Sequence, residues 1–291
     1  MIGDLFSIIA PVFICAGIGF IWARQDHPYD TNLVTTLVTN IGAPCLVFYT
    51  LVDVKIDIEA FSTMAMASIA ATALFGIISA VIIKALGANL RTFVPSMMFT
   101  NCGNMGLPLS LLAFGDPGLA LAIVFFMVSA VGQFTIGMAM ASGHMSPEKL
   151  ARMPLLYAVA AGLAVIVTGY RPPDVFINTT NLLGGMTIPL MLITLGISLA
   201  KLKVASFGRS IGFSVLRLVM GVAVGVVLAD LFGFTGVERG VLILQSAMPV
   251  AVFNYLFAVR YDRAPEEVAG MVVISTALSF ATLPALLWFV L

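Results

Sequence analysis

Two asparagines, two glycines and a proline lie close together in the segment TNCGNMGLPLS, and their spacing could build a binding site for an anion. Gly103 and Gly106 let a chain leave helical geometry. Pro108 suits the first turn of the helix that follows, because its missing N–H would be unpaired there anyway. Asn101 and Asn104 can cap the free N–H groups of that turn and still face a ligand. A helix N-terminus carries a partial positive charge, which favours a negatively charged ligand.

The segment lies in the middle of an uncharged stretch, an unfavourable place for residues that break helices. Between Arg91 and Asp116 there are 24 residues without a formal charge, and a helix of that length can cross a hydrocarbon core of about 30 Å. Irregular backbone at membrane depth is tolerated only where it is buried in protein or lines a cavity. We therefore expect a membrane helix that is broken near its centre and lines a cavity.

The composition places the chain in a membrane and excludes several kinds of partner. Of its 291 residues, 60% are hydrophobic and 10% are charged, whereas a soluble domain carries about 25% charged residues. The formal net charge is zero, which argues against nucleic acid, because binding to phosphates needs a basic surplus. Cys15, Cys45 and Cys102 lie in apolar windows without metal-ligand spacing, so no metal, cofactor or disulfide is expected.

Cutting the chain at its charged residues gives apolar windows long enough to span a bilayer. The nine uncharged windows of 18 residues or more are 5–23, 31–52, 60–83, 92–115, 117–147, 153–170, 175–200, 240–259 and 268–291. A tenth apolar stretch, 210–229, is interrupted only by Arg217. The economical interpretation is an all-α integral membrane protein with ten transmembrane helices.

The distribution of Lys and Arg between alternate loops indicates how these helices are oriented. One set of loops holds ten basic residues: Arg24, Lys84, Arg91, Lys149, Arg152, Lys201, Lys203, Arg209, Arg260 and Arg263. The other set holds three: Lys55, Arg171 and Arg239. By the positive-inside rule the first set is cytoplasmic, so both termini are expected on the outer side of the cell (inner) membrane.

An internal repeat divides the chain into two halves. The segments NIGAPCLVFYTL and GMTIPLMLITLG align Pro44 with Pro189, an offset of 145 residues, and the same offset places Pro249 opposite Asn104. Each half holds five helices, and this odd number makes the second half inverted relative to the first. Inverted repeats with broken helices at matching positions, here the fourth and the ninth, are typical of secondary transporters, and the breaks point to the substrate site.

The second broken helix offers polar residues that could complete the site. Gln245 and Ser246 lie one turn before Pro249, which would begin a second half-helix. Polar groups also hold membrane helices together, so a packing role for Gln245 and Ser246 stays open. Pro44 and Pro189 either kink helices that face the substrate or are plain packing kinks.

Arg217 is an ionisable residue inside an apolar span, which makes it a candidate counter-ion for an acidic substrate. The alternative is structural: Arg209 marks the end of the same helix about 12 Å away, so Arg217 could snorkel to the interface or bind backbone carbonyls. No Asp or Glu lies in the middle of a span, and Asp116, just past the first broken helix, is the nearest candidate for coupling to protons or sodium. Coupling through backbone and hydroxyl oxygens, or drive by the membrane potential, stays open.

The motif NCGNMGLP in the fourth span resembles the signature of the auxin efflux carrier family, which includes plant PIN-type auxin transporters and bacterial carriers for malate or malonate. The ten spans, the outside termini and the prolines in spans two, four, seven and nine fit this family over the whole chain. The long hydrophilic loop of the plant members is missing, and the residues QSAM precede Pro249 without the asparagine that plant members have there. The resemblance therefore implies a compact bacterial-type member, with Asn101 and Asn104 at the substrate carboxylate.

The resemblance also implies the crossover fold that the family shares with sodium–proton antiporters and bile-acid symporters. Helices 1, 2, 6 and 7, over residues 1–58 and 150–203, would form a scaffold. Helices 3–5 and 8–10, over residues 59–145 and 206–291, would form a mobile transport domain. Elevator-type movement, a substrate held where helices four and nine cross, and a homodimer formed through the scaffold follow from the same resemblance.

The predicted function is secondary transport of a small organic anion, a mono- or dicarboxylate such as malate, malonate or an auxin-like acid. Alternatives are a sodium-coupled symporter of the bile-acid type, a channel, and a membrane receptor that binds without transport. An enzyme is not expected, because an intramembrane nucleophile needs a base and the two histidines, His27 and His144, lie in loops.

Overall fold

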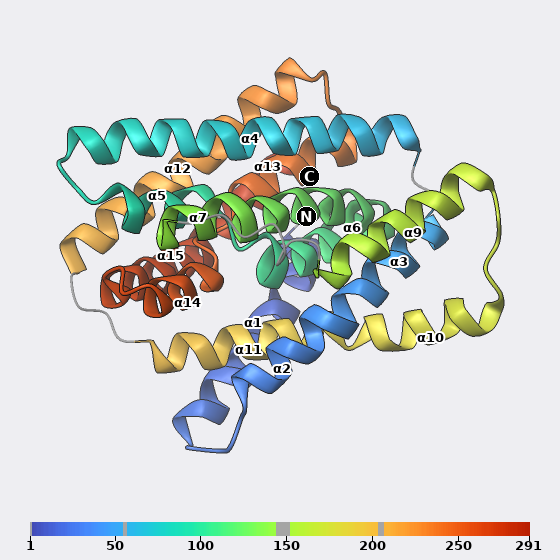
Figure 1. The fold of residues 1–291 in the computed structure, drawn as a ribbon, viewed down its shortest axis with the longest axis horizontal. Helices are drawn as coiled ribbons and strands as arrows, with labels where there is room; N and C mark the ends of the chain where they lie inside the picture. The colour runs from blue at the N-terminus through green and yellow to red at the C-terminus, as the bar shows by residue number, and fades with distance from the viewer. Residues whose placement is uncertain (1, 55–56, 144–151, 203–206) are drawn as a thin grey trace.

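The computed structural model describes residues 2–54, 57–143, 152–202 and 207–291 (Figure 1). These residues form α-helices and three short π-helical turns, and their β-structure is limited to an isolated antiparallel bridge between Thr100 and Val250. Seven described helical stretches are long and apolar enough to cross a membrane: Leu5–Arg24, Thr31–Val54, Ile58–Ala85, Cys102–Ser142, Asp174–Lys201, Phe207–Leu231 and Pro265–Val290. The expected all-α class is confirmed at this level.

A first group of helices comes from the beginning and the middle of the chain. Helix α1 packs along α11, and α3 packs along α9. Gly19 and Gly196 allow α1 and α11 to approach closely, because a Cβ on either glycine would collide with a backbone carbonyl of the other helix. The elements of this group are α1 (Ile2–Arg24), α2 (Thr31–Leu37), the π-helical turn η1 (Val38–Gly42), α3 (Ala43–Val54), α9 (Pro154–Thr168), α10 (Asp174–Gly185) and α11 (Thr187–Lys201).

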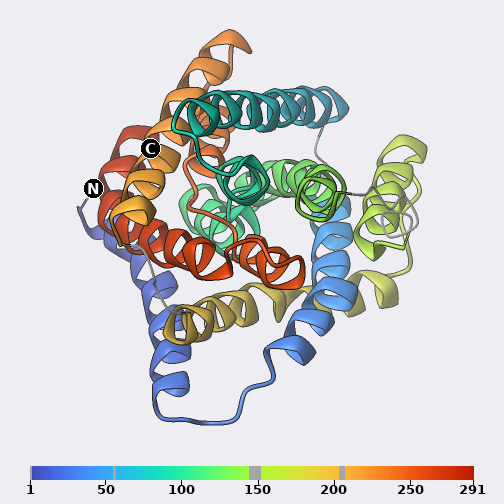
Figure 2. The same cartoon turned by 60° about the vertical axis from the view of Figure 1, so that its left-hand side comes forward.

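The second group contains the two interrupted segments of the chain. Helix α4 packs on α6 and α12, and α12 packs on α13 and α15. Figure 2 shows the green α6 near the centre of the molecule, with the other helices around it. The elements of this group are α4 (Ile58–Ala85), α5 (Leu90–Met98), η2 (Cys102–Gly106), α6 (Leu107–Gly132), η3 (Gln133–Gly137), α7 (Met138–Ser142), α12 (Phe207–Leu231), α13 (Gly236–Ser246), α14 (Val252–Arg260) and α15 (Pro265–Val290).

Helix α6 contains a sharp turn at Gly115, where φ is 67° and ψ is −159°, a conformation that L side chains rarely adopt. Asp116 and Pro117 follow, and all three residues are exposed. The turn divides the apolar stretch Cys102–Ser142, whose 41 residues exceed the roughly 20 that one crossing needs. It falls where two uncharged windows of the sequence meet, on either side of Asp116.

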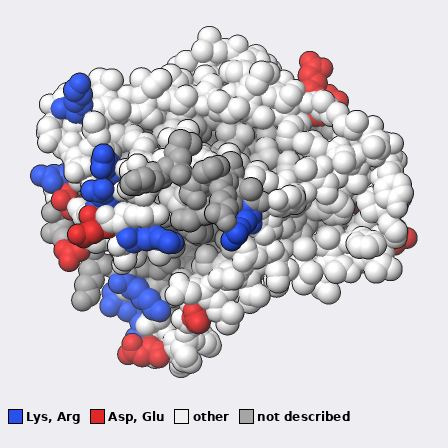
Figure 3. All heavy atoms as spheres, in the orientation of Figure 1, with Lys and Arg blue, Asp and Glu red and all other residues white. Residues whose placement is uncertain are grey.

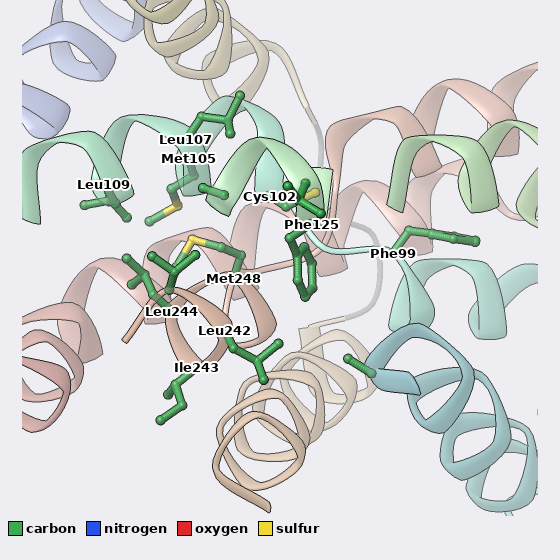
Figure 4. Packing of buried hydrophobic residues seen from close by; sticks show 14 of the residues in the cluster. Phe99, Cys102, Met105, Leu107, Leu109, Phe125, Leu242, Ile243, Leu244 and Met248 are labelled. Carbon is green, nitrogen blue, oxygen red and sulfur yellow. The ribbon is translucent and has the colours of Figure 1, made fainter. Parts of the chain in front are cut away.

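The interior is filled by apolar side chains from both interrupted segments. Figure 4 shows Phe99 and Met105 of the first segment in the same packed region as Leu244 and Met248 of the second. All four side chains are completely buried. The two breaks in the helices are therefore embedded in protein, which is the condition for irregular backbone at membrane depth.

Many large apolar side chains are exposed on the exterior. Phe6, Leu182 and Leu231 are 72%, 79% and 74% exposed, respectively. Figure 3 shows that most of one face is uncharged, while Lys and Arg side chains gather toward its left-hand side, with some Asp and Glu among them. An apolar belt with charges collected toward one end suits a chain that lies across a bilayer.

Candidate functional site

The two interrupted segments cross where α5 and α13 end, and a pair of backbone hydrogen bonds joins them. The N–H of Asn101 donates to the carbonyl oxygen of Pro249 at 2.7 Å, and the N–H of Ala251 donates to the carbonyl oxygen of Phe99 at 3.2 Å. Each extended segment thus uses the other to satisfy backbone groups that a helix would have paired internally. This joint between the two segments consists of backbone groups of four residues: Phe99, Asn101, Pro249 and Ala251.

Two helix N-termini begin at this joint. The turn η2 starts directly after Asn101, and α14 starts directly after Ala251. The first N–H groups of a helix have no partner within it, and they carry a partial positive charge. The sequence analysis predicted that two half-helix N-termini meet at mid-membrane, and η2 and α14 both begin beside this joint. Pro249 differs from the expectation, because it precedes the first turn of α14 and contributes its carbonyl oxygen to the joint.

The side chain of Asn101 is buried, with 3% of its surface exposed. It makes no capping hydrogen bond to η2, so the predicted capping role is wrong for this residue. Its Nδ2 group has no hydrogen-bond partner among the described residues. A buried amide without a partner is costly unless something supplies an acceptor, and Asn101 lines a cavity that a ligand could enter.

Two adjoining cavities, of about 360 and 270 Å³, reach the crossing between the two groups of helices. Asn104 lines both of them, while Asn101 and Gly103 line the larger. Among the described lining residues the charged ones are cationic: Arg152, two residues before α9, in the larger cavity and Lys201, at the end of α11, in the smaller. The remaining polar lining groups are hydroxyls and amides.

All three π-helical turns of the described chain contribute to the wall of the larger cavity. Thr39 comes from η1, Asn104 from η2 and Gln133 from η3. A π-helical turn inserts one extra residue into a helix, and such turns occur frequently at functional sites. Three of them around one cavity indicate that this region departs from regular helix for a common reason.

The glycines of η2 have a different role from the one expected. Gly106 has ordinary helical angles, φ −68° and ψ −44°, and Gly103 is not among the glycines with positive φ. Both provide space instead: a Cβ on Gly103 would lie 2.9 Å from the ring of Phe126, and a Cβ on Gly106 would collide with the side-chain oxygen of Gln245. Pro108 lies in the first turn of α6, as predicted, directly after η2.

Gln245 and Ser246 lie at the end of α13, and both are completely buried. The Nε2 group of Gln245 donates to the hydroxyl oxygen of Ser110 at 3.1 Å, which ties α13 to α6. Neither Gln245 nor Ser246 lines either cavity. In this structure the two residues therefore pack at the end of α13 without lining a cavity.

The predicted prolines of the first helix group do not line the cavities either. Pro44 is half-buried in α3, and Pro189 is exposed in α11. Arg217 is completely buried in α12, and its Nη2 group donates to the carbonyl oxygen of Ser246 at 2.8 Å. Of the two structural alternatives, binding to a backbone carbonyl is observed and snorkelling to the interface is not.

Beside the crossing, sequence reasoning missed Gln133, which takes part in a chain of hydrogen bonds. The Nε2 group of Gln133 donates to the Oδ1 atom of Asn254 at 3.0 Å, and the Nδ2 group of Asn254 donates to the carbonyl oxygen of Phe99 at 3.2 Å. It also missed Thr35 and Thr39, which line both cavities from the first group of helices. Their spacing of four residues on one helix face was the available signal.

Tyr29 holds a loop next to the smaller cavity. Its hydroxyl group lies 2.6 Å from the Oγ1 atom of Thr194, which lines that cavity. Burial raises the pKa of Tyr29, and the hydrogen bond to Thr194 opposes this with a smaller effect. The phenol therefore stays protonated at neutral pH and keeps a proton for this hydrogen bond.

Comparison with known proteins adds a family to this geometry. A family model described as a membrane transport protein matches residues 138–288, which is more than half of the chain. An uncharacterized transporter of Methanocaldococcus jannaschii is 28% identical over 203 residues, which cover 66% of this chain and 65% of that protein.

Two further relatives have names that include a substrate. A protein of Rhizobium meliloti, provisionally named a malonate transporter, is 23% identical over 311 aligned positions, 99% of this chain and 96% of that protein. Auxin efflux carrier component 2 of Oryza sativa subsp. japonica is 27% identical over 146 residues, 48% of this chain and 22% of that protein. The chain belongs to the membrane transport protein family that also contains the auxin efflux carriers.

Proposed function

We propose that this protein is a secondary transporter of a small organic anion, a mono- or dicarboxylate, that binds where the two interrupted segments cross. The observation that carries the proposal is the buried Nδ2 group of Asn101, which has no hydrogen-bond partner among the described residues and lines a cavity beside two helix N-termini. An amide N–H and the free N–H groups of two helices are all hydrogen-bond donors. A carboxylate accepts several hydrogen bonds and carries the charge that these N-termini favour.

The charges near the cavities support an anionic substrate. Arg152 and Lys201 are exposed residues among those that line the larger and the smaller cavity, respectively. A cleft lined by one sign of charge raises the local concentration of ligands of the opposite sign. The names of two relatives also mention acids, malonate and auxin, and both compounds carry a carboxylate at neutral pH.

We further propose ten membrane crossings arranged as two inverted repeats of five. The turn at Gly115 separates the fourth membrane span from the fifth, and the short apolar helix α9 supplies the sixth span. The packing of the helices supports this count. Exchanging the two halves turns the contact of α1 with α11 into the contact of α9 with α3, and both contacts are present.

The division into two helix groups suggests how the substrate would move. In this proposal residues 1–58 and 150–203 form a scaffold, while 59–145 and 206–291 form a transport domain that slides against it like an elevator. Both groups supply lining residues, Thr39 from one and Asn104 from the other, so relative movement would expose the site to each side in turn. A homodimer through the scaffold remains part of the proposal, with the exposed apolar residues of α10, such as Val175 and Leu182, available for it.

The proposed orientation puts the basic loops in the cytoplasm of the cell, with both termini outside. Arg152 and Lys201 belong to these loops, so the cavities that they line would open toward the cytoplasm. Two other basic residues of the cytoplasmic set, Lys149 and Lys203, lie outside the described residues.

The decisive experiment is uptake of labelled carboxylates, malonate and malate included, into proteoliposomes that contain the purified protein. Membrane potential, pH gradient and sodium gradient are varied one at a time. Saturable uptake of one acid is expected, and Asn104→Ala is expected to abolish it while the protein stays folded. The matched control is Asn178→Ala, because Asn178 is an exposed asparagine on α10 outside both cavities.

Near-normal uptake by Asn104→Ala would contradict the proposed site. Saturable binding of an acid without any uptake would indicate a receptor rather than a transporter. Uptake that strictly requires sodium would favour the sodium-coupled alternative.

A further inference from the structure

Arg217 is enclosed completely by protein. A cation without an ion-pair partner is more favourable at the protein surface. None of its surface is exposed. Its Nη2 group donates to the carbonyl oxygen of Ser246 at 2.8 Å, and its guanidinium carbon lies 4.4 Å from the centroid of the Phe75 ring. Arg217 lies on α12, and it contacts α4 through Phe75 and the end of α13 through Ser246. It thus joins three helices.

The carbonyl that Arg217 binds belongs to a special position in the fold. Ser246 is the last residue of α13, the half-helix that ends at the crossing. The C-terminus of a helix carries a partial negative charge, and its last carbonyl groups lack partners within the helix. In the interior, where water does not reach these groups, a cation at this end balances the partial negative charge and donates a hydrogen bond to a free carbonyl group.

Helix α12 is shaped to bring Arg217 to this position. Gly221 and Gly225 lie one and two turns further along the same face as Arg217. A Cβ on Gly221 would collide with the carbonyl oxygen of Ser246, and a Cβ on Gly225 would lie 3.0 Å from the Cα of Ile243. These two glycines let the end of α13 approach closely enough for the guanidinium to reach its carbonyl oxygen.

No carboxylate of the described residues forms an ion pair with Arg217. Among the described residues, the ion pairs of the structure involve Arg171, Arg209 and Arg239 rather than Arg217. Its Nε and Nη1 groups also lack hydrogen-bond partners in the described part of the chain. A buried cation that is held by a carbonyl dipole and an aromatic ring keeps its full charge available to the region around the crossing.

Transporters with interrupted helices place coupling cations at this kind of position. The C-terminal ends of half-helices and the unwound carbonyl groups coordinate sodium ions or protons, while the N-terminal ends face the anion. We propose that the guanidinium group of Arg217 takes the place of such a coupling cation at the end of α13, so that the moving helices carry their own positive charge and the anion is transported without sodium. The consequence for sodium rests on the proposed transport function, whereas the role at α13 does not.

Thermal unfolding of the purified full chain in detergent tests the role at α13 directly. The melting temperature of the unaltered protein is expected to be the same in sodium, potassium and choline chloride at equal ionic strength. Arg217→Ala is expected to melt about 5–10 °C lower, since a buried charge-assisted hydrogen bond is lost. Millimolar guanidinium ion, which fits the vacated space, is expected to recover at least half of that loss in a saturable manner.

Arg209→Ala is the matched control, because Arg209 lies on the same helix but is exposed and paired with Glu267. Guanidinium ion is expected to leave its melting temperature unchanged. Arg217→Lys and Arg217→Met separate charge from packing, and the lysine variant is expected to melt higher. The Arg217→Ala protein could prove too unstable to purify without guanidinium ion. A folded protein obtained only when guanidinium ion is present during purification would support the proposal in the same way.

Three results would overturn the proposal. They are a saturable rise in the melting temperature of the unaltered protein with sodium, an equal response of Arg217→Ala and Arg209→Ala to guanidinium ion, or an Arg217→Met variant as stable as Arg217→Lys. Uptake measured with and without sodium then tests the consequence separately. A protein that shows the expected melting behaviour but takes up no carboxylate would refute the transport function and leave the role of Arg217 intact.

Discussion

The backbone N–H of Asn101 donates a 2.7 Å hydrogen bond to the carbonyl oxygen of Pro249, 148 residues further along the chain. This bond explains why Asn101 can lie at a helix start without capping it, because its main chain is already fixed by the partner segment. The side chain is then left to face the cavity. The backbone of Asn101 thus holds the two segments together, while its side chain is available to bind a ligand.

Replacing Asn101 with Asp should separate these two groups. The substitution keeps the shape and the backbone bond to Pro249, but puts a carboxylate where a donor faces the cavity. Repulsion between like charges about 4 Å apart in a partly dry site should weaken binding of an anion at least about 100-fold. The measurement is uptake or direct binding of the carboxylate that the unaltered protein prefers.

The melting temperature of Asn101→Asp should stay close to that of the unaltered protein, because a negative charge at two helix N-termini is favourable. Asn178→Asp, on the exposed face of α10, controls for added charge alone. Unchanged affinity of a folded Asn101→Asp protein would show that the anion binds elsewhere.

The helices and their two breaks were predictable because the bilayer restricts what a sequence can do there. Charges mark the ends of spans, and a run such as Gly103 to Pro108 stands out in an apolar window. The position of Pro108 was predictable for the same reason. Proline has no N–H group, so at that depth it is tolerated mainly in the first turn of a helix. The choice of cavity residues was less predictable, and the reason is the π-helical turns.

Each π-helical turn adds a residue, so the side chains after it rotate to another face of the helix. Pro44 follows η1 and lies off the cavity, whereas Thr39 within η1 lines it. The role of Gly106 was also hidden, because the side chain that needs its space, Gln245, comes from the other half of the chain. Contacts between distant segments leave no periodic trace in a single sequence.

Gly106→Ala tests that contact. A methyl group would overlap the side-chain oxygen of Gln245, and overpacking of this kind typically destabilises a protein by about 1–3 kcal/mol. We expect a lower melting temperature and impaired uptake, since η2 and the end of α13 would be pushed apart at the crossing. Gly212→Ala is a suitable control, because a Cβ on Gly212 meets no atom within 4 Å.

The double variant Gly106→Ala, Gln245→Ala should recover part of the stability, because the shorter side chain vacates the space that the methyl group needs. The two effects should therefore be non-additive. Purely additive losses would mean that Gly106 is required for a reason other than contact with Gln245.

Lys201→Gln tests the charge at the smaller cavity. Lys201 is exposed and lies at the end of α11, so its contribution should be attraction of the anion rather than a close contact in the bound state. Uptake from the cytoplasmic side should show a KM raised about 2–5-fold with little change in kcat, and the effect should shrink at high salt. Lys84→Gln, which is outside both cavities, should leave KM unchanged.

Accessibility of single cysteines tests the orientation on which this argument depends. In a protein whose native Cys15, Cys45 and Cys102 are replaced, Lys84→Cys and Asp174→Cys each supply one thiol at an exposed position. The positive-inside rule puts Lys84 in the cytoplasm and Asp174 outside, so a membrane-impermeant maleimide should label only Asp174→Cys in intact cells. Opening the cells should add labelling of Lys84→Cys. Labelling of Lys84→Cys from outside would reverse the topology, and the cavities that Arg152 and Lys201 line would then open away from the cytoplasm.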